Sequence, residues 1–200
     1  MIWALVLLAY LLGATPTSYI VGRWFHGIDL REHGSGNLGA TNVFRVLGWK
    51  AAVPVGLVDV AKGWVPTALF PAWDAAADPE WALAYGAAAI VGHVFSIYVR
   101  FRGGKGVATS AGVFTALAPW ATLAALVVWL VVLLLSRIVS LSSLAAAVTL
   151  PAAVYLTDEP RLTLWLALGL AAFVIYAHRS NIRRLARGEE NRFGSKGRRS

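Results

Sequence analysis

The chain is 200 residues long, and 58% of its residues are hydrophobic while only 14% are charged. Soluble domains carry about 25% charged residues, so the composition excludes an ordinary soluble protein. The sequence contains no cysteine, which excludes disulfides, thiolate catalysis and cysteine-ligated zinc.

Apolar runs long enough to cross a bilayer recur along the chain, since a hydrocarbon core of roughly 30 Å needs about 20 residues. They are Ile2–Val21, Ala51–Pro71, Trp81–Val99, Val107–Ser136, Ile138–Thr157 and Leu162–Ala177. The fourth run is too long for one span, and Pro119 near its middle indicates a break. We therefore predict an all-α, polytopic integral membrane protein with about seven transmembrane helices, five being the alternative. Residues 1–200 are expected to form a single membrane-embedded domain.

The charges between these runs predict the orientation of the chain. No charge precedes Arg23, unlike in a signal peptide, so the first run is expected to be a retained helix. Segments 23–50, 100–106 and 178–200 are basic, whereas segments 72–80 and 157–161 are mostly acidic. Because basic loops remain in the cytoplasm, we expect the N-terminus outside and the C-terminus inside.

The basic tail, from about residue 179, carries most of the formal net charge of +8. Beside an apolar span, such a segment more often contacts anionic lipid head groups than nucleic acid. No nucleic-acid-binding module accompanies it. We therefore expect the lipid bilayer, and not nucleic acid, as its partner.

The first polar segment, His33–Asn42, is rich in glycine and is followed by Arg45; we name it the first glycine loop. Glycines allow successive backbone N–H groups to converge on an anion. Hydrogen-bonding side chains accompany them, and Thr41 or Asn42 is expected to cap the helix that carries Arg45. The alternative is an ordinary glycine-rich turn.

The second polar segment, Arg100–Thr109, places three glycines around Lys105 directly before an apolar helix; we name it the second glycine loop. Backbone amides, a helix N-terminus and an ammonium group together favour anion binding. The spacing is not that of a Walker A loop. Positive-inside flanking explains Arg100 and Arg102, but not the glycines.

The third polar segment, His178–Glu190, follows the last apolar run. On a helix, His178 and Asn181 would lie on one face, whereas the arginines are typical of a solvated basic helix end. Ser142 follows Arg137 closely and would lie at the same cytoplasmic mouth.

Polar residues also occur within the predicted spans. Asp59 and Lys62 are three positions apart and are expected to pair, as membrane charges usually do. A structural ion pair is the simpler interpretation. His93 is as compatible with packing as with catalysis.

Together these segments resemble the bacterial membrane glycerol-3-phosphate acyltransferases that use acyl-phosphate, the PlsY family. The resemblance covers nearly the whole chain and rests on five motifs in the family's order. They are Gly34–Asn42 with Arg45 and Gly48; Asp59–Gly63; Gly92–Ser96; Gly103–Thr109; and His178, Asn181, Leu185, Gly188 and Glu190.

The resemblance implies transfer of an acyl group from acyl-phosphate to the sn-1 hydroxyl of glycerol 3-phosphate, in phospholipid biosynthesis at the bacterial inner membrane. The active site would face the cytoplasm. Acyl-phosphate would be bound by Ser35, Gly36, Asn37, Gly39, Thr41 and Asn42. Glycerol 3-phosphate would be bound by Arg45, Gly103, Gly104, Lys105, Gly106, Ser142, His178 and Asn181, of which Arg45, Lys105, His178 and Asn181 would also be catalytic. Supporting roles fall to Asp59, Lys62, His93 and Glu190.

The implied chemistry needs no cofactor, no metal and no covalent intermediate, because an acyl-phosphate is already activated. A soluble enzyme that makes acyl-phosphate is an expected partner. Acylation from acyl-CoA is disfavoured because none of the four histidines precedes an aspartate at H-x-x-x-x-D spacing. A transporter of phosphorylated solutes remains the alternative, although its site should lie near the membrane midplane and these segments cluster at one face.

Overall fold

The computed structural model describes residues 1–74 and 80–193, and every regular element in these ranges is a helix. The all-α prediction is thus confirmed. The chain divides into two compact units, Met1–Pro119 and Trp120–Ser200. Asp78 of the predicted outer loop, and Lys196, Arg198 and Arg199 of the basic tail, lie outside the described residues.

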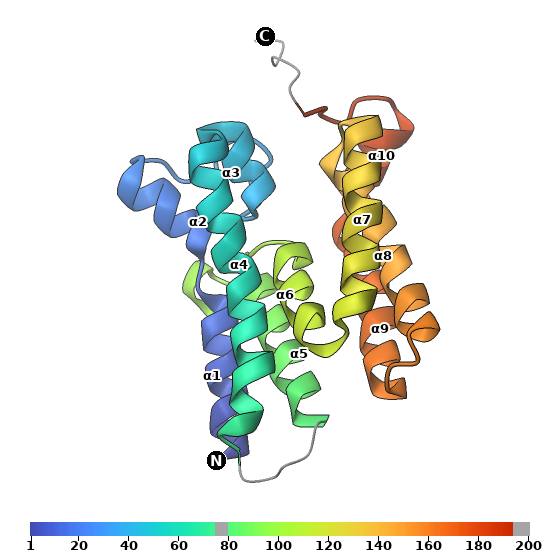
Figure 1. The fold of residues 1–200 in the computed structure, drawn as a ribbon. Coiled ribbons are helices and arrows are strands. Elements are labelled where there is room, and N and C mark those ends of the chain that lie inside the picture. Colours follow the sequence, from blue (N-terminus) through green and yellow to red (C-terminus); the bar gives the residue numbers. More distant parts are fainter. Residues whose placement is uncertain (75–79, 194–200) are drawn as a thin grey trace. The chain divides into compact units, whose positions relative to one another are not determined.

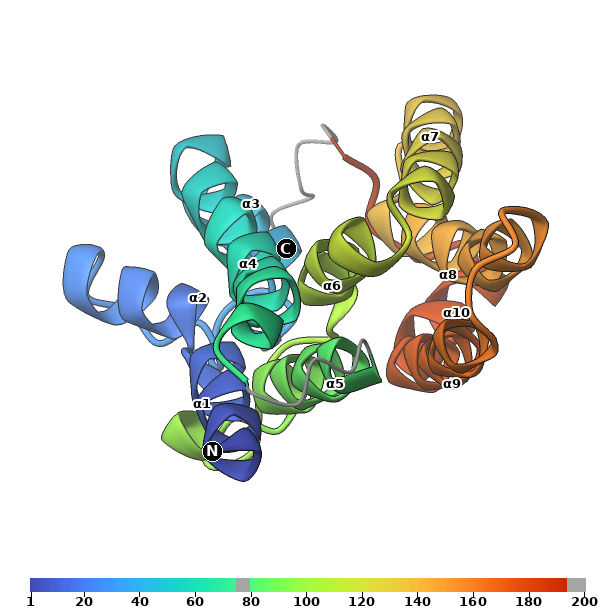
Figure 2. The same ribbon diagram turned by 60° about the horizontal axis from the view of Figure 1, so that its bottom comes forward.

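The first unit is built on helices α1 (Ile2–Ala14), α4 (Trp49–Leu69), α5 (Glu80–Val94) and α6 (Val107–Leu117). Helix α4 packs against α5 and α6, and α1 packs against α5 (Figure 1). The end-on view in Figure 2 shows these helices side by side. Short elements connect them: α2 (Thr17–Ile20), the π-helical turn η1 (Val21–Phe25), α3 (Ala40–Leu47), and the 3₁₀ turns η2 (Phe70–Ala72) and η3 (Ile97–Val99).

The helices of the first unit approach one another closely at glycines. A Cβ added to Gly112 on α6 would lie 2.0 Å from the carbonyl oxygen of Val60 on α4. A Cβ added to Gly13 on α1 would lie 2.1 Å from the carbonyl oxygen of Ala89 on α5. Small residues at such crossings are typical of membrane helices, which associate by close packing because lipid gives no hydrophobic drive.

The first apolar run is not one helix, contrary to the prediction for Ile2–Val21. Thr15 is extended (φ −51°, ψ 115°) because the ring of Pro16 disfavours helical backbone in the residue before it. Helix α1 therefore ends at Ala14, and the segment Thr17–Phe25 is bent from it by 41°.

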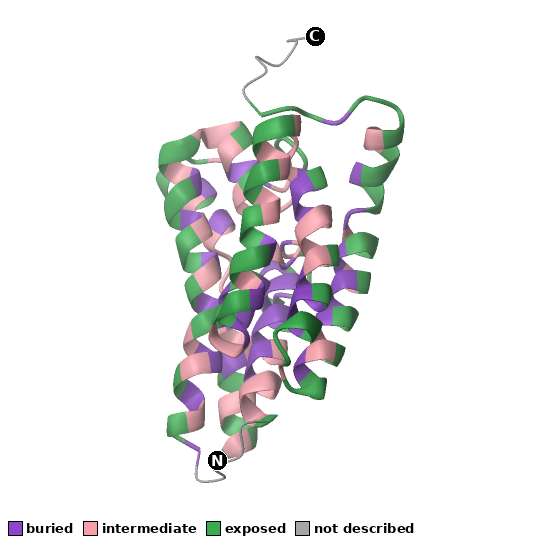
Figure 3. Ribbon diagram, turned by 45° about the vertical axis from the view of Figure 1, so that its right-hand side comes forward, coloured by how far each residue is buried: buried purple, intermediate pink, exposed green. Residues whose placement is uncertain are grey.

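The second unit contains α7 (Pro119–Ser136, whose first residue belongs to the first unit), α8 (Val139–Leu156), α9 (Arg161–Ala177) and α10 (Arg179–Ala186). The predicted break at Pro119 is confirmed, since α6 ends at Leu117 and α7 begins at the proline. Figure 3 shows that exposed residues cover the outward faces of the helices while buried residues face their neighbours. Many exposed residues of α7 are large and apolar, such as Leu134 and Leu135, as expected for a lipid-facing helix.

Four helical segments among the described residues are long and apolar enough to cross a membrane. Two bent pairs, Ile2–Ala14 with Thr17–Phe25 and Arg161–Ala177 with Arg179–Ala186, raise the number to six if each pair is one span. Helix α6 is apolar but shorter. The number seven, the single domain and the predicted orientation remain predictions.

Candidate active site

The first glycine loop is organised around the side chain of Asn42, which is 1% exposed. Its Oδ1 accepts hydrogen bonds from the backbone N–H of Ser35 (2.8 Å) and from the Ser35 hydroxyl (3.1 Å). Its Nδ2 donates to the carbonyl oxygens of Leu30 (3.2 Å) and His33 (3.0 Å). Gly34, at φ +64°, has no room for a side chain, because a Cβ there would lie 2.3 Å from Asn42 Oδ1. Asn42 thus holds the loop together from inside.

The sequence predicts that Thr41 or Asn42 caps the helix that carries Arg45. The structure shows that neither residue does so. Helix α3 begins at Ala40, and its N-cap is Gly39, which has no side chain to donate or accept. Asn42 cannot cap the helix because its amide is used by Ser35, Leu30 and His33. Thr41 and Arg45 are four residues apart and both exposed, so they lie on one face of α3.

Sequence reasoning did not single out the ion pair that lies just before the first glycine loop. The Arg31 guanidinium contacts Asp29 Oδ2 at 2.6 Å and lies over the ring of Tyr19, 4.9 Å from its centroid. The hydrogen bond from the Arg31 side chain lowers the pKa of Asp29 to about 2. The opposite charges of Asp29 and Arg31, two residues apart, were the sequence signal of this pair, and the contact of Arg31 with Tyr19 joins the segment before the loop to α2.

The second glycine loop turns back onto the end of α5. The backbone N–H groups of Gly103 and Gly104 donate to the carbonyl oxygens of Val94 (3.0 Å) and His93 (3.2 Å). These two amides are therefore engaged within the chain, unlike in the predicted anion cradle. Gly106, at φ +82°, is the N-cap of α6. The half-buried Lys105 precedes it directly.

The predicted pairing of Asp59 with Lys62 is confirmed. Lys62 Nζ lies 2.8 Å from Asp59 Oδ1 and also donates to the carbonyl oxygen of Thr15 (2.9 Å), at the break after α1. His93 Nδ1 lies 3.9 Å from the same carboxylate oxygen. That distance is too long for a hydrogen bond, so the ring packs beside the carboxylate without binding it directly. All three side chains are buried.

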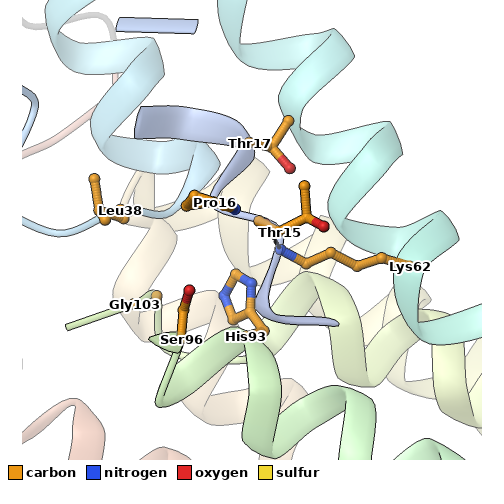
Figure 4. Close-up of a pocket in the computed structure, with 9 residues that line it drawn as sticks. Thr15, Pro16, Thr17, Leu38, Lys62, His93, Ser96 and Gly103 are labelled. Atoms are coloured by element: carbon orange, nitrogen blue, oxygen red, sulfur yellow. Dashed lines mark hydrogen bonds between the residues drawn. The ribbon is translucent and has the colours of Figure 1, made fainter. Parts of the chain in front are cut away.

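A small cavity brings parts of both glycine loops together within the first unit (Figure 4). Its volume is about 10 Å³, the space of roughly one water molecule. Leu38 of the first loop and Gly103 and Gly104 of the second loop line it, together with Lys62 and His93. The two loops that were predicted to bind phosphate are thus neighbours.

The remaining predicted residues lie in the second unit. His178 stands between α9 and α10, where the chain bends by 58°. Its Nδ1 is 2.8 Å from the carbonyl oxygen of Val174. Because a carbonyl only accepts, Nδ1 carries the proton in the neutral ring. Ser142 is fully buried in α8 and donates to the carbonyl oxygen of Ile138.

Glu190 joins α10 to the segment that follows it. Its carboxylate accepts hydrogen bonds from Asn181 Nδ2 (2.8 Å) and Arg184 Nε (2.7 Å). Burial alone would raise the pKa of this carboxyl, but the bonds from Arg184 and Asn181 outweigh that effect and lower the pKa. Glu190 therefore orients Asn181, and its supporting role in the reaction remains a prediction.

Long apolar helices, with two glycine loops that meet at one cavity, define an integral membrane protein with neighbouring polar loops. The sequence profile of the glycerol-3-phosphate acyltransferase family matches residues 3–188. The glycerol-3-phosphate acyltransferase of Synechococcus sp. strain JA-2-3B'a(2-13) is 49% identical, over 96% of this chain and 94% of that protein. The corresponding protein of Geobacillus kaustophilus is 46% identical, over 98% of both chains.

Solved structures agree with the sequence comparisons. The crystal structure of PlsY, an integral membrane glycerol 3-phosphate acyltransferase, in its glycerol 3-phosphate form has a TM-score of 0.91 and 39% identity, and the alignment covers 97% of this chain and 96% of that one. The lysophosphatidic acid form gives a TM-score of 0.88 at 38% identity, with the same coverage. The chain belongs to the glycerol-3-phosphate acyltransferase family, and within it to the PlsY type of integral membrane protein.

Proposed function

We propose that the protein transfers an acyl group from acyl-phosphate to the sn-1 hydroxyl of glycerol 3-phosphate, giving lysophosphatidic acid and phosphate. The observation that carries the proposal is the membership of the chain in the glycerol-3-phosphate acyltransferase family, and the contact between the two glycine loops at one cavity supports it. Both substrates carry phosphate. The first glycine loop is followed by the cationic Arg45, and the second contains Lys105. Two adjacent loops with these cations suit a reaction that must hold two phosphates near each other.

The first glycine loop would hold acyl-phosphate. Ser35 and Thr41 are exposed and Asn37 is half-buried, so their side chains are accessible to a ligand. Gly36 and Gly39 would let the phosphate approach the backbone. Asn42 would act indirectly, by holding Ser35 in place.

Glycerol 3-phosphate would be held by Arg45, Lys105, His178 and Asn181, with Ser142 and the start of α6 at Gly106 assisting. Charged donors are the strongest partners for phosphate oxygens. Gly103 and Gly104 would contribute by shaping the turn that carries Lys105. Asp59, Lys62 and Glu190 would support these groups without contacting substrate.

The reaction would be a direct displacement. The sn-1 oxygen forms a bond to the acyl carbon, the bond from that carbon to the phosphate oxygen breaks, and phosphate leaves with the electron pair. The hydroxyl proton passes either to a substrate phosphate oxygen or to His178 Nε2, the ring nitrogen opposite the one that donates to Val174. The protein contributes positioning and charge stabilisation, and no metal or cofactor is required.

We place the active site on the cytoplasmic side of the bacterial inner membrane, because the basic segments include both glycine loops. A water-soluble enzyme would supply the acyl-phosphate, and the acyl chain would lie in the bilayer. The test is to incubate the purified protein with glycerol 3-phosphate and either acyl-phosphate or acyl-CoA. We expect lysophosphatidic acid and free phosphate only when acyl-phosphate is the donor. Lysophosphatidic acid formed from acyl-CoA but not from acyl-phosphate would refute the proposed donor.

Lys105→Ala tests the assignment of the second loop. Removal of one preorganised charged contact should lower kcat/KM by a factor of about 10² to 10³, mainly through a higher KM for glycerol 3-phosphate. Arg102→Ala is the matched control, because Arg102 is an exposed cation of the same loop. Equal effects of the two substitutions would indicate that Lys105 contributes only general positive charge.

A further inference from the structure

The side chain of His93 lies directly beneath Gly104. A Cβ built on Gly104 would be 2.2 Å from His93 Nε2 and 2.7 Å from Cε1. No real Cβ approaches a ring atom so closely, so a side chain at position 104 would have to displace the imidazole. The ring therefore forms the surface on which this part of the second glycine loop rests.

Gly103 approaches the same residue in a different way. A Cβ built on Gly103 would be 1.9 Å from the carbonyl oxygen of His93. That contact is with backbone, so changing the His93 side chain cannot relieve it. The two neighbouring glycines thus touch two different parts of one residue.

The His93 ring is buried against the Asp59–Lys62 ion pair on the side away from Gly104. It is 6% exposed, and its Nδ1 faces the carboxylate of Asp59, which is paired with Lys62. Lys62 also binds the carbonyl oxygen of Thr15, so the pair joins α4 to the break after α1. Figure 4 shows Lys62 reaching Thr15 beside the His93 ring, with Gly103 close by. Such buried charges are costly to separate, so the Asp59–Lys62 pair forms a fixed surface against which the buried ring packs.

We infer that His93 is a positioning residue for Lys105, acting through Gly104. Two backbone hydrogen bonds attach the Gly103–Gly104 turn to the end of α5, and the ring limits how closely Gly104 can approach it. Lys105 is the next residue along the chain. Displacement of the turn by about 1 Å would move the ammonium away from the phosphate it is proposed to bind, which is enough to cost up to about 100-fold in rate. The inference rests on the proposed role of Lys105 in binding glycerol 3-phosphate.

A suppressor experiment tests this inference. Gly104→Ala alone should raise the KM for glycerol 3-phosphate by about 10- to 100-fold, because the new methyl group lifts the turn off the ring. The double variant Gly104→Ala/His93→Ala removes the ring that the methyl group meets. We expect the KM of the double variant for glycerol 3-phosphate to be at least about tenfold lower than that of Gly104→Ala. Such a non-additive result is detected by a double-mutant cycle.

Gly103→Ala is the matched control, since its methyl group would meet the His93 backbone oxygen. The same His93→Ala substitution should give Gly103→Ala no recovery. The KM for acyl-phosphate should change less than that for glycerol 3-phosphate in every variant, whereas a general loss of structure would change both. If a variant with His93→Ala does not fold, as judged by thermal unfolding in detergent, His93→Gln replaces it, because a flexible side chain can turn away from the added methyl group.

A second measurement keeps the inference independent of turnover. Deuterium uptake of residues 95–106, followed by mass spectrometry, should rise in Gly104→Ala and return toward the parent value in the double variant. Additive damage in both measurements, or equal recovery of Gly103→Ala, would overturn the inference. If the parent protein makes no lysophosphatidic acid, the proposed function fails, while the exchange measurement still decides whether His93 supports the loop.

Discussion

Replacement of Asn42 by alanine tests whether this residue holds the first glycine loop in shape. The substitution removes the acceptor of the Ser35 N–H and the donor to Leu30 and His33. Each buried group left without a partner costs about 1–3 kcal/mol. We expect the local opening of the loop to become about 5- to 150-fold easier if the loss of one such group dominates.

Deuterium exchange of residues 30–40 measures this opening directly, because the Ser35 N–H loses its acceptor. Exchange should accelerate within the predicted range, and the KM for acyl-phosphate should rise with it. Asn42→Asp is a stricter version. It keeps an acceptor for Ser35 but turns a second oxygen toward the carbonyl groups of Leu30 and His33, so exchange should still accelerate.

Asn37→Ala is the matched control, because Asn37 lies in the same loop and is proposed to contact the substrate. It should raise the KM for acyl-phosphate while leaving exchange of residues 30–40 unchanged. If Asn42→Ala leaves exchange as slow as in the parent, the hydrogen bonds of Asn42 do not hold the loop. Its assignment as an organising residue would then be refuted.

Three further predictions concern stability, pH and topology. Gly112→Ala should lower the melting temperature in detergent, because its methyl group meets a backbone oxygen of α4, whereas Gly169→Ala, with open space around it, should not. Because the pKa of Glu190 is lowered from 4.5, its contribution to stability is full above that value and is lost as the pH falls through the folded pKa. Melting temperatures of the parent should therefore decline more steeply in acid than those of Glu190→Gln; parallel curves would contradict this. In intact cells an impermeant thiol reagent should label Asp158→Cys but not Glu32→Cys, and the reverse result would invert the topology.

Much of the helical framework could be predicted because its signals are local. Long apolar runs fix where helices occur, and Pro119 marks the division between α6 and α7. The three-residue spacing of Asp59 and Lys62 predicted their contact, since helical residues at this spacing are neighbours. The break before Pro16 had the same kind of signal, but it was missed within an otherwise continuous apolar run.

The internal geometry of the loops could not be predicted, because it depends on partners distant in the sequence. Nothing around Gly103 or Gly104 indicates that their amides bond to the end of α5. Similarly, asparagine is a residue type common at helix N-caps, yet the side-chain amide of Asn42 binds residues 30–35 instead. The glycine-rich composition indicated that both segments form unusual loops, but it did not indicate which of their polar groups bond within the chain and which face outward.

The two glycine loops are built in the same way. In each, a glycine rests on a buried polar side chain: a Cβ on Gly34 would lie 2.3 Å from Asn42 Oδ1, and one on Gly104 would lie 2.2 Å from His93 Nε2. These glycines are therefore explained by the support beneath them, without any bound anion. We propose that the outer layer of side chains, which includes Ser35 and Lys105, contacts the substrates. Because that layer is held by buried residues, substitution of Asn42 or His93 should impair catalysis by misplacing these side chains in a protein that still folds.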